Sequence, residues 1–303
     1  METTKCKNFK VIGYFPNWHG DVVEQMDWEE LTHVNYAFAI PTAEGTIRAF
    51  IDNALVHKLI ETAHRHHVKA GLSVGGWSYE EETLEGTFVQ ATQTDEKCRL
   101  LADGIMDVVD AYGFDGVDMD WEYPREGTSA KQYESFMALL RSELTKRGKF
   151  LTAAVVGYGE AALGQTAEVL RILDWVNVMA YDGEGDEGHS PYSYAVECGE
   201  YWINTRGVPP DKLVMGIPFY GRPDWLSYRD IIAGDPAAAA KDSIEANGTK
   251  IYYNGLATIA DKTAWACRNA CGVMIWEITQ DSREEEYSLL KQIGRTVRQH
   301  VPD

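Results

Sequence analysis

Four carboxylates lie within eight residues of an otherwise apolar stretch, and they are the residues best suited to chemistry: Asp115, Asp118, Asp120 and Glu122. If the stretch is a β-strand, alternate side chains share a face, which places Asp118, Asp120 and Glu122 in one column at a spacing of about 7 Å. Like charges this close cannot all ionise freely, so one carboxyl should keep its proton near neutral pH. A carboxyl that keeps its proton is a general acid.

Two other interpretations of this cluster are open. The spacing of the acids resembles the start of a calcium-binding EF-hand loop, but that loop needs Gly at its sixth position and Glu at its twelfth, where this chain has Tyr123 and Ser129. Clustered acids also commonly form a solvated turn. Val117, Met119 and Trp121 occupy the alternate positions, and this favours a packed strand over either alternative.

The rest of the chain alternates short apolar runs with amphipathic stretches, a pattern typical of βα units around a parallel sheet. Helical periodicity is readable between the runs, and one predicted helix begins after Thr94 or Asp95 and ends at Tyr112, with Gly113 beyond it. No linker-like stretch interrupts the pattern. We therefore expect an α/β fold with one catalytic domain over 1–303, a single (β/α)8 barrel whose strands lie at 11–15, 33–38, 69–74, 116–121, 151–156, 175–179, 213–217 and 273–276.

Composition and length agree with this expectation. The 303 residues are 45% hydrophobic and 25% charged, so a large core is available. The net charge of −19 argues against nucleic acid or an anionic membrane surface as a partner, because binding to phosphates relies on Lys and Arg. The stretch 230–254, after the seventh strand, is a modest elaboration that is too short for a second domain or for a large α+β insertion.

Several classes of site and segment are not expected. The polar stretch 1–7 lacks the apolar core of a secretory leader, and no apolar run is long enough for a membrane span. The odd, scattered cysteines Cys6, Cys98, Cys198, Cys267 and Cys271 do not form a disulfide framework and are expected to be reduced. No Cys or His group has the spacing of a metal site, and His64, His66 and His67 are expected on a solvated face, so we expect neither metal nor cofactor.

Catalysis in such a barrel takes place where the strands end at their carboxyl side. The residues there are unusually aromatic and polar. Aromatic faces stack on the apolar C–H faces of sugars while polar groups bind the hydroxyls, so these strand ends indicate a carbohydrate site. They comprise Tyr14, Asn17, Trp18, Phe38, Ser73, Trp77, Glu122, Met179, Tyr181, Asp182, Tyr220, Arg222 and Trp276.

The chain resembles glycoside hydrolase family 18, the chitinase family. The acids match its pattern D-x-x-D-x-D-x-E, and the chain continues into Tyr123 and Pro124 as chitinases often do. Further matches follow in the expected order at 73–76, 179–182, 216–222 and 274–276. The resemblance covers essentially the whole chain, and several motifs in the right order are more specific than any one of them.

The resemblance implies retaining hydrolysis of β-1,4-linked N-acetylglucosamine, in chitin or chito-oligosaccharides, by a substrate-assisted route. Glu122 would be the general acid and base, Asp120 would orient the acetamido group, Asp118 would share a proton with Asp120, and Tyr181 would donate to the acetamido group. It further implies that Trp276 forms the floor, that Asp182 contacts the sugar, and that Tyr14 and Ser73 steady the lower acids. Phe38, Trp77, Met179, Tyr220 and Arg222 would complete the substrate site, while Asp115 points off the column and serves the strand and loop geometry.

One departure leaves the substrate open. Many processive chitinases carry a sizeable insertion between strands seven and eight, and here only 230–254 could fill its place, so a shallower cleft suited to short oligosaccharides or N-glycan cores is expected. An endo-β-N-acetylglucosaminidase acting on N-glycan or cell-wall glycan is the alternative enzyme, and a chitinase-like lectin is the alternative binding protein. We expect a monomer whose partner is an N-acetylglucosamine-containing glycan, and secretion follows from the resemblance if a leader precedes this chain.

Overall fold

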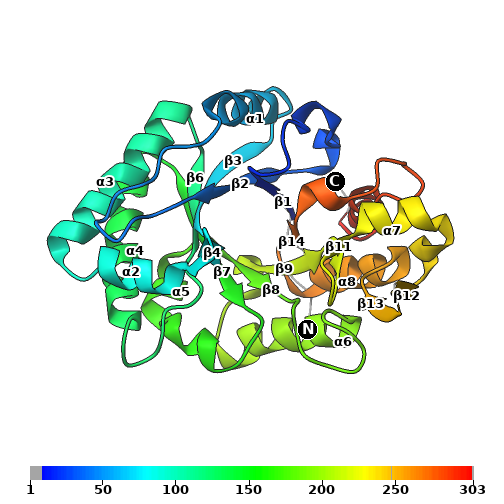
Figure 1. Ribbon diagram of the computed structural model, residues 1–303. Coiled ribbons are helices and arrows are strands. Elements are labelled where there is room, and N and C mark those ends of the chain that lie inside the picture. The colour runs from blue at the N-terminus through cyan, green and yellow to red at the C-terminus, as the bar shows by residue number, and fades with distance from the viewer. Residues whose placement is uncertain (1–8, 247, 302–303) are drawn as a thin grey trace. The chain divides into compact units, whose positions relative to one another are not determined.

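The eight strands that carry the predicted site residues form a closed barrel in the order β1-β14-β9-β8-β7-β6-β3-β2 (Figure 1). This is the (β/α)8 architecture that the sequence predicts. It is seen in a computed structural model that describes residues 9–246 and 248–301. The barrel strands are β1 (Lys10–Pro16), β2 (His33–Ala39), β3 (Lys69–Gly75), β6 (Gly116–Asp120), β7 (Phe150–Val156), β8 (Trp175–Met179), β9 (Leu213–Pro218) and β14 (Gly272–Trp276).

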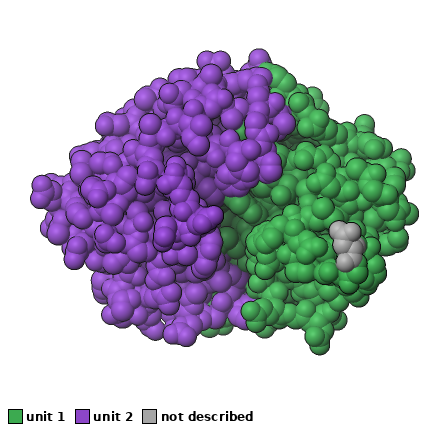
Figure 2. Space-filling model, in the orientation of Figure 1, with its two compact units in different colours: residues 1–15, 24–32, 177–303 green, residues 16–23, 33–176 purple. Residues whose placement is uncertain are grey.

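The chain divides into two compact units, coloured separately in Figure 2. One comprises residues 1–15, 24–32 and 177–303, and the other comprises residues 16–23 and 33–176. We call them the C-terminal unit and the N-terminal unit. The α-helices are α1 (Asn53–Arg65), α2 (Leu84–Ala91), α3 (Asp95–Tyr112), α4 (Ala130–Lys146), α5 (Ala167–Ile172), α6 (Tyr192–Glu200), α7 (Tyr228–Gly234), α8 (Leu256–Asn269) and α9 (Leu289–His300).

The N-terminal unit contains the acidic strand between two neighbours that pair with it in parallel. β6 pairs with β3, which places Ser73 beside Asp118, and with β7, which places Thr152 beside Asp118 on its other side. Helix α3, which precedes β6, begins at the predicted cap because the Thr94 hydroxyl accepts a hydrogen bond from Lys97 N at 3.2 Å. It ends at Gly113, whose φ of 82° is left-handed, and the chain then turns into β6.

The C-terminal unit contains β1, β14 and β9, and β14 pairs in parallel with both of the others. The elaboration expected after the seventh strand is present between β9 and α8. It consists of the two-stranded sheet β10 (Tyr220–Gly221) and β11 (Leu226–Ser227), helix α7, a 3-10 turn at Pro236–Ala240 and the hairpin β12 (Ser243–Ala246) and β13 (Thr249–Tyr252).

Most sequence expectations that the structure describes are met, with small shifts at strand ends. The acidic strand ends at Asp120, one residue before the predicted end, and Glu122 lies beyond the strand, as in the prediction. Cys98, Cys198, Cys267 and Cys271 are buried. None of the described helices has the length and apolar character that a bilayer span requires. The stretch 1–7, with Cys6, lies outside the described residues, and the extent of the domain stays a prediction.

Candidate active site

Asp118 lies in the middle of β6 and is completely buried. Two hydroxyls from the neighbouring strands hold its carboxylate: Ser73 donates to Oδ2 at 3.1 Å and Thr152 donates to Oδ1 at 2.6 Å. A buried carboxylate is tolerated only when such donors replace its water. Ser73 thus lies against the lower acid of the column, as expected, and the register of the three strands explains why.

Asp120, the last residue of β6, is only 4% exposed, and its Oδ1 has no hydrogen-bond partner in the described part of the chain. Burial, followed by the charges of Glu122 and Asp118, raises the pKa of Asp120 well above its usual range. A hydrogen bond with Glu122 acts in the same direction. Asp120 therefore tends to keep a proton in the folded protein.

Glu122 is half-buried and lies just past the strand, where the chain is firmly anchored on both sides. The preceding Trp121 is 1% exposed and stacks on Phe88 with a ring separation of 4.8 Å and an interplanar angle of 10°. The Trp121 ring also meets Tyr133 edge to face, at 5.5 Å. On the following side, Pro124 packs so closely against Gly164 that a Cβ there would lie 1.6 Å from the Pro124 carbonyl oxygen. These contacts fix the position of Glu122 without using its carboxyl group.

The glycine pair after β3 lets that strand end lie against Asp120. Gly75 has φ +117°, and a Cβ on it would come within 2.3 Å of the Asp120 carbonyl oxygen. Gly76 N donates to the same oxygen at 2.8 Å. A side chain at position 75 would therefore push apart the ends of β3 and β6, which explains why the motif needs glycine here.

Aromatic residues of the N-terminal unit follow the same strand ends. Phe38, at the end of β2, is half-buried and lies 6.3 Å from Trp18 between ring centroids. Trp77 is 57% exposed and lies 6.4 Å from the ring of Tyr123, the residue after Glu122. A large aromatic ring exposed to water is unfavourable unless a ligand covers it. Trp18 and Trp77 are therefore candidates for stacking on a sugar.

In the C-terminal unit, Asp182 is the centre of a polar cluster. Tyr220 donates its hydroxyl to Asp182 Oδ2 at 2.8 Å, and Arg222 Nε lies 3.5 Å from Oδ1. The same Oδ1 lies 3.2 Å from Nδ1 of His189, which is buried and only 5% exposed. The Asp182 carboxylate is thus fixed from three directions, although its side chain is 37% exposed.

The other predicted residues of this unit form a second aromatic group. The ring of Tyr14 meets Trp276 edge to face at 5.8 Å, and the Tyr14 hydroxyl accepts a hydrogen bond from Asn177 Nδ2 at 3.1 Å. Tyr181 is buried, and its hydroxyl contacts the sulfur of Met274 at 3.8 Å. Met179 is the half-buried last residue of β8. Gly216 makes room for Tyr181, because a Cβ there would lie 2.9 Å from the Tyr181 ring.

Some residues of these clusters were missed by sequence reasoning. Thr152 contacts Asp118, and His189 contacts Asp182. Trp225 stacks on Tyr220 at 5.0 Å, and the Arg222 guanidinium lies 4.0 Å from the centre of the Trp225 ring. Thr152 could have been found, as the one hydroxyl residue in an otherwise apolar strand. His189 and Trp225 lie in loops without a periodic pattern, and no sequence signal marks them. Within the described residues, no three His, Cys, Asp or Glu side chains are grouped as metal ligands.

Comparison with known proteins shows which family has this sequence and fold. The sequence model described as Glycosyl hydrolases family 18 matches residues 10–281. The chain belongs to this family. It is 30% identical, over 73% of its length, to a probable chitinase 10 of Drosophila melanogaster. The solved structure of the family 18 chitinase ChiB, from the chitin utilization locus of Flavobacterium johnsoniae, has a TM-score of 0.85 and 30% identity, covering 96% of this chain and 94% of that one.

A chitinase structure from Bacteroides thetaiotaomicron gives a TM-score of 0.82 at 27% identity, with 97% of this chain and 98% of that one covered. The chain spans much less of the curated relatives. It covers 11% of the Drosophila protein, and 43% and 60% of chitinases from Niallia circulans and Aphanocladium album.

Proposed function

We propose that this protein is a chitinase-type glycoside hydrolase that cleaves β-1,4-linked N-acetylglucosamine with retention of configuration, using the substrate's own acetamido group as the nucleophile. The observation that carries this proposal is the buried Asp118–Asp120 pair directly before Glu122. The names of the relatives and their shared family support the substrate class. Substrate assistance is the route that this family uses in place of a second catalytic carboxylate.

The acid column supports a division of roles. Glu122 protonates the glycosidic oxygen as the bond to the leaving sugar breaks, and it later removes a proton from the incoming water. Asp120, with its raised pKa, accepts a hydrogen bond from the acetamido N–H as its own proton moves toward Asp118. The acetamido oxygen then attacks the anomeric carbon and gives an oxazolinium ion. The hydroxyls of Ser73 and Thr152 hold Asp118 in place while its charge changes.

Residues of the C-terminal unit bind the sugar in this proposal. Tyr181 donates to the acetamido oxygen, and Trp276, held edge to face by Tyr14, lies under the pyranose ring. Asp182 accepts hydrogen bonds from sugar hydroxyls, because Tyr220, Arg222 and His189 fix its carboxylate in one orientation. Met179 packs around the ring. In the N-terminal unit, Phe38 packs against a sugar and Trp77 stacks on a sugar on the leaving side. No cofactor takes part.

Product analysis on chitotetraose in heavy-oxygen water tests the proposal. We expect one heavy oxygen per cleavage, at the new reducing end, with the β-anomer appearing first. Cellotetraose, which lacks the acetamido group, should not be cleaved, because it offers no internal nucleophile. Initial release of the α-anomer, or equal cleavage of cellotetraose, would rule out substrate assistance. Binding of chitotetraose without any turnover would instead favour the chitinase-like lectin.

The substrate itself is tested by a side-by-side digest of chitotetraose and a high-mannose glycoprotein. We expect chitotetraose to be cleaved much faster, since Tyr123 and Pro124 continue the acidic motif as they do in chitinases. Faster release of the N-glycan would assign the protein to the endo-β-N-acetylglucosaminidases. The same acid column would then act on a different substrate.

A further inference from the structure

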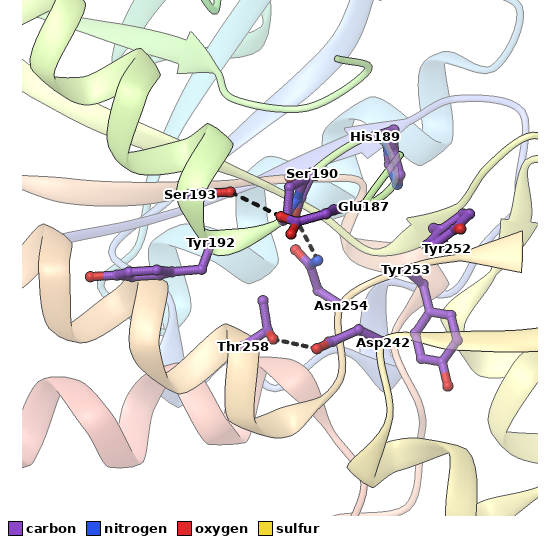
Figure 3. A pocket seen from close by; sticks show the side chains of 11 residues that line it. Glu187, His189, Ser190, Tyr192, Ser193, Asp242, Tyr252, Tyr253, Asn254 and Thr258 are labelled. Atoms are coloured by element: carbon purple, nitrogen blue, oxygen red, sulfur yellow. Dashed lines mark hydrogen bonds between the residues drawn. The ribbon is translucent and has the colours of Figure 1, made fainter. Parts of the chain in front are cut away.

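A pocket of about 380 Å³ lies in the C-terminal unit, between the loop before α6, the hairpin β12–β13 and the start of α8 (Figure 3). Among the residues given a role in the proposed hydrolysis, His189, which holds Asp182, is the one that lines it. Figure 3 shows Tyr192 on one side and Tyr252 and Tyr253 on the other, with Ser190 and Asn254 between them. Its volume is within the range of small-molecule sites in proteins.

The charge of the pocket lining is entirely negative. Glu187 and Asp242 contribute carboxylates, and no Lys or Arg side chain is among the lining residues. Two lysines adjoin the lining: Lys250 Nζ lies 4.7 Å from the ring centre of Tyr252, and Lys262 is completely buried behind Ser190 and Asn254. Its ammonium group donates all three N–H bonds within the protein, each at 2.7 Å, to Ser190 O, Ser190 Oγ and Asn254 Oδ1. Lys262 therefore braces the wall and leaves no donor for a ligand.

The pocket can bind a ligand through carboxylates and aromatic faces. Asp242 accepts from Gly255 N and Thr258 Oγ1, which fixes its carboxylate and leaves acceptor capacity on both oxygens. The face of Tyr252 already attracts one ammonium group, since Lys250 Nζ lies 4.7 Å from its ring centre. Carboxylates combined with aromatic rings are the usual surroundings of a bound organic ammonium group.

A buried histidine connects this pocket with the polar cluster around Asp182. His189 lines the pocket, is 5% exposed, and its Nε2 has no hydrogen-bond partner in the described part of the chain. Its other nitrogen lies 3.2 Å from Asp182 Oδ1. A second connection runs through the backbone, because Tyr252 and Arg222 exchange hydrogen bonds of 2.9 Å in both directions.

We propose that this pocket is a second binding site, for a sugar that carries a free ammonium group such as a glucosamine unit, and that His189 links its occupancy to Asp182. The ammonium group lies between Glu187 and Asp242, the pyranose ring lies against Tyr192 or Tyr252, and His189 forms part of the wall. Partly deacetylated chitin contains such units. Binding at the pocket is independent of the proposed hydrolysis, whereas an effect on Asp182 rests on it.

The test uses the full chain carrying Glu122→Gln, which removes turnover. Binding of the glucosamine dimer is measured by calorimetry at about pH 6, where amino groups are protonated. We expect the further exchanges Glu187→Gln and Asp242→Asn together to weaken binding about tenfold, since two charge contacts are lost. Glu184→Gln, on the same exposed loop but away from the pocket, is the matched control and should change binding less than about twofold.

Two readouts decide between outcomes. In protein with labelled histidine, the glucosamine dimer should shift the His189 signal, identified by its loss in His189→Gln, and diacetylchitobiose should bind the pocket more weakly because it lacks the charge. If the double exchange leaves binding unchanged, or if the acetylated dimer competes equally, the proposal is wrong. Either failure leaves the test of hydrolysis on chitotetraose untouched, because that test does not depend on this pocket.

Discussion

Asp115 and Asp120 lie at the two ends of the acidic strand and differ in almost every physical respect. Asp115, just before β6, accepts hydrogen bonds from Ala70 N and Lys69 Nζ at 2.8 Å, and His64 Nε2 lies 2.8 Å from its Oδ2. Burial alone would raise the pKa of Asp115, but these contacts outweigh it and hold the pKa below its usual range. Asp120 has carboxyl neighbours instead, and its pKa is raised.

The contrast between Asp115 and Asp120 shows that the two ends of this barrel strand have different roles. At the amino end, a carboxylate surrounded by donors ties the starts of β3 and β6 together and is ionised in the folded protein. At the carboxyl end, burial beside other acids keeps a proton available for chemistry. This division matches the general behaviour of such barrels, where one face provides stability and the other carries catalysis.

The largest effect is expected when the outermost acid is removed. Glu122→Gln keeps the size of the side chain but cannot donate a proton at the leaving oxygen, so kcat on chitotetraose should fall about 10²–10⁴-fold. The melting temperature should stay unchanged, because the anchoring contacts of Trp121 and Pro124 do not use the carboxyl group. A variant that retained most of its activity would show that Glu122 is not the acid.

Asp120→Asn should lower kcat about a hundredfold, because an amide cannot take up the charge that develops beside the acetamido group. The folded protein should be no less stable near neutral pH. Because the pKa of Asp120 is raised in the folded state, its side chain lowers the stability of the protein as the pH rises above the pKa of the unfolded state. The amide of the variant does not titrate and removes this loss. Thermal unfolding across pH, paired with kcat, measures both effects. A strongly destabilised variant would contradict the assignment of Asp120 to chemistry.

Asp115→Asn should show the opposite behaviour, with kcat unchanged and stability reduced by about 1–3 kcal/mol at neutral pH, since ionic hydrogen bonds at a largely buried carboxylate are lost. The folded pKa of Asp115 is lowered, so its contribution is present above its unfolded pKa of about 3.8 and disappears as pH falls through the folded value. Chemical denaturation of both proteins at neutral and acid pH measures this. A loss of kcat at constant stability would contradict it.

The smallest change concerns Asp118→Asn. The charge of Asp118 contributes to the raised pKa of Asp120, after burial and the charge of Glu122, so its removal should lower that pKa. The alkaline limb of the kcat profile should therefore move to lower pH. Ser73→Ala is a useful control, since it removes one hydrogen bond to Asp118 and no charge. A limb that does not move would show that the two acids are not coupled.

The fold and the acid column follow from patterns that sequence carries directly. Eight apolar runs separated by helical stretches indicate the barrel, and alternation of acids with Val117, Met119 and Trp121 indicates a packed strand. The end of β6 was predicted to within one residue, whereas the packing of Trp121 against Phe88 and Tyr133 could not be predicted, because both come from distant segments. His189 was out of reach for a similar reason: only tertiary folding brings its loop against Asp182.

The most direct test of the account is a carboxyl ¹³C NMR titration of protein with labelled aspartate, with signals assigned by their loss in Asp115→Asn and Asp120→Asn. We expect the Asp120 carboxyl to titrate above the ordinary value of about 3.8 and the Asp115 carboxyl to titrate below it. If both carboxyls titrate together near that value, or if Asp120 is ionised at the lower pH of the two, the two ends of the strand do not differ as described and the proton assigned to the acid column is not there.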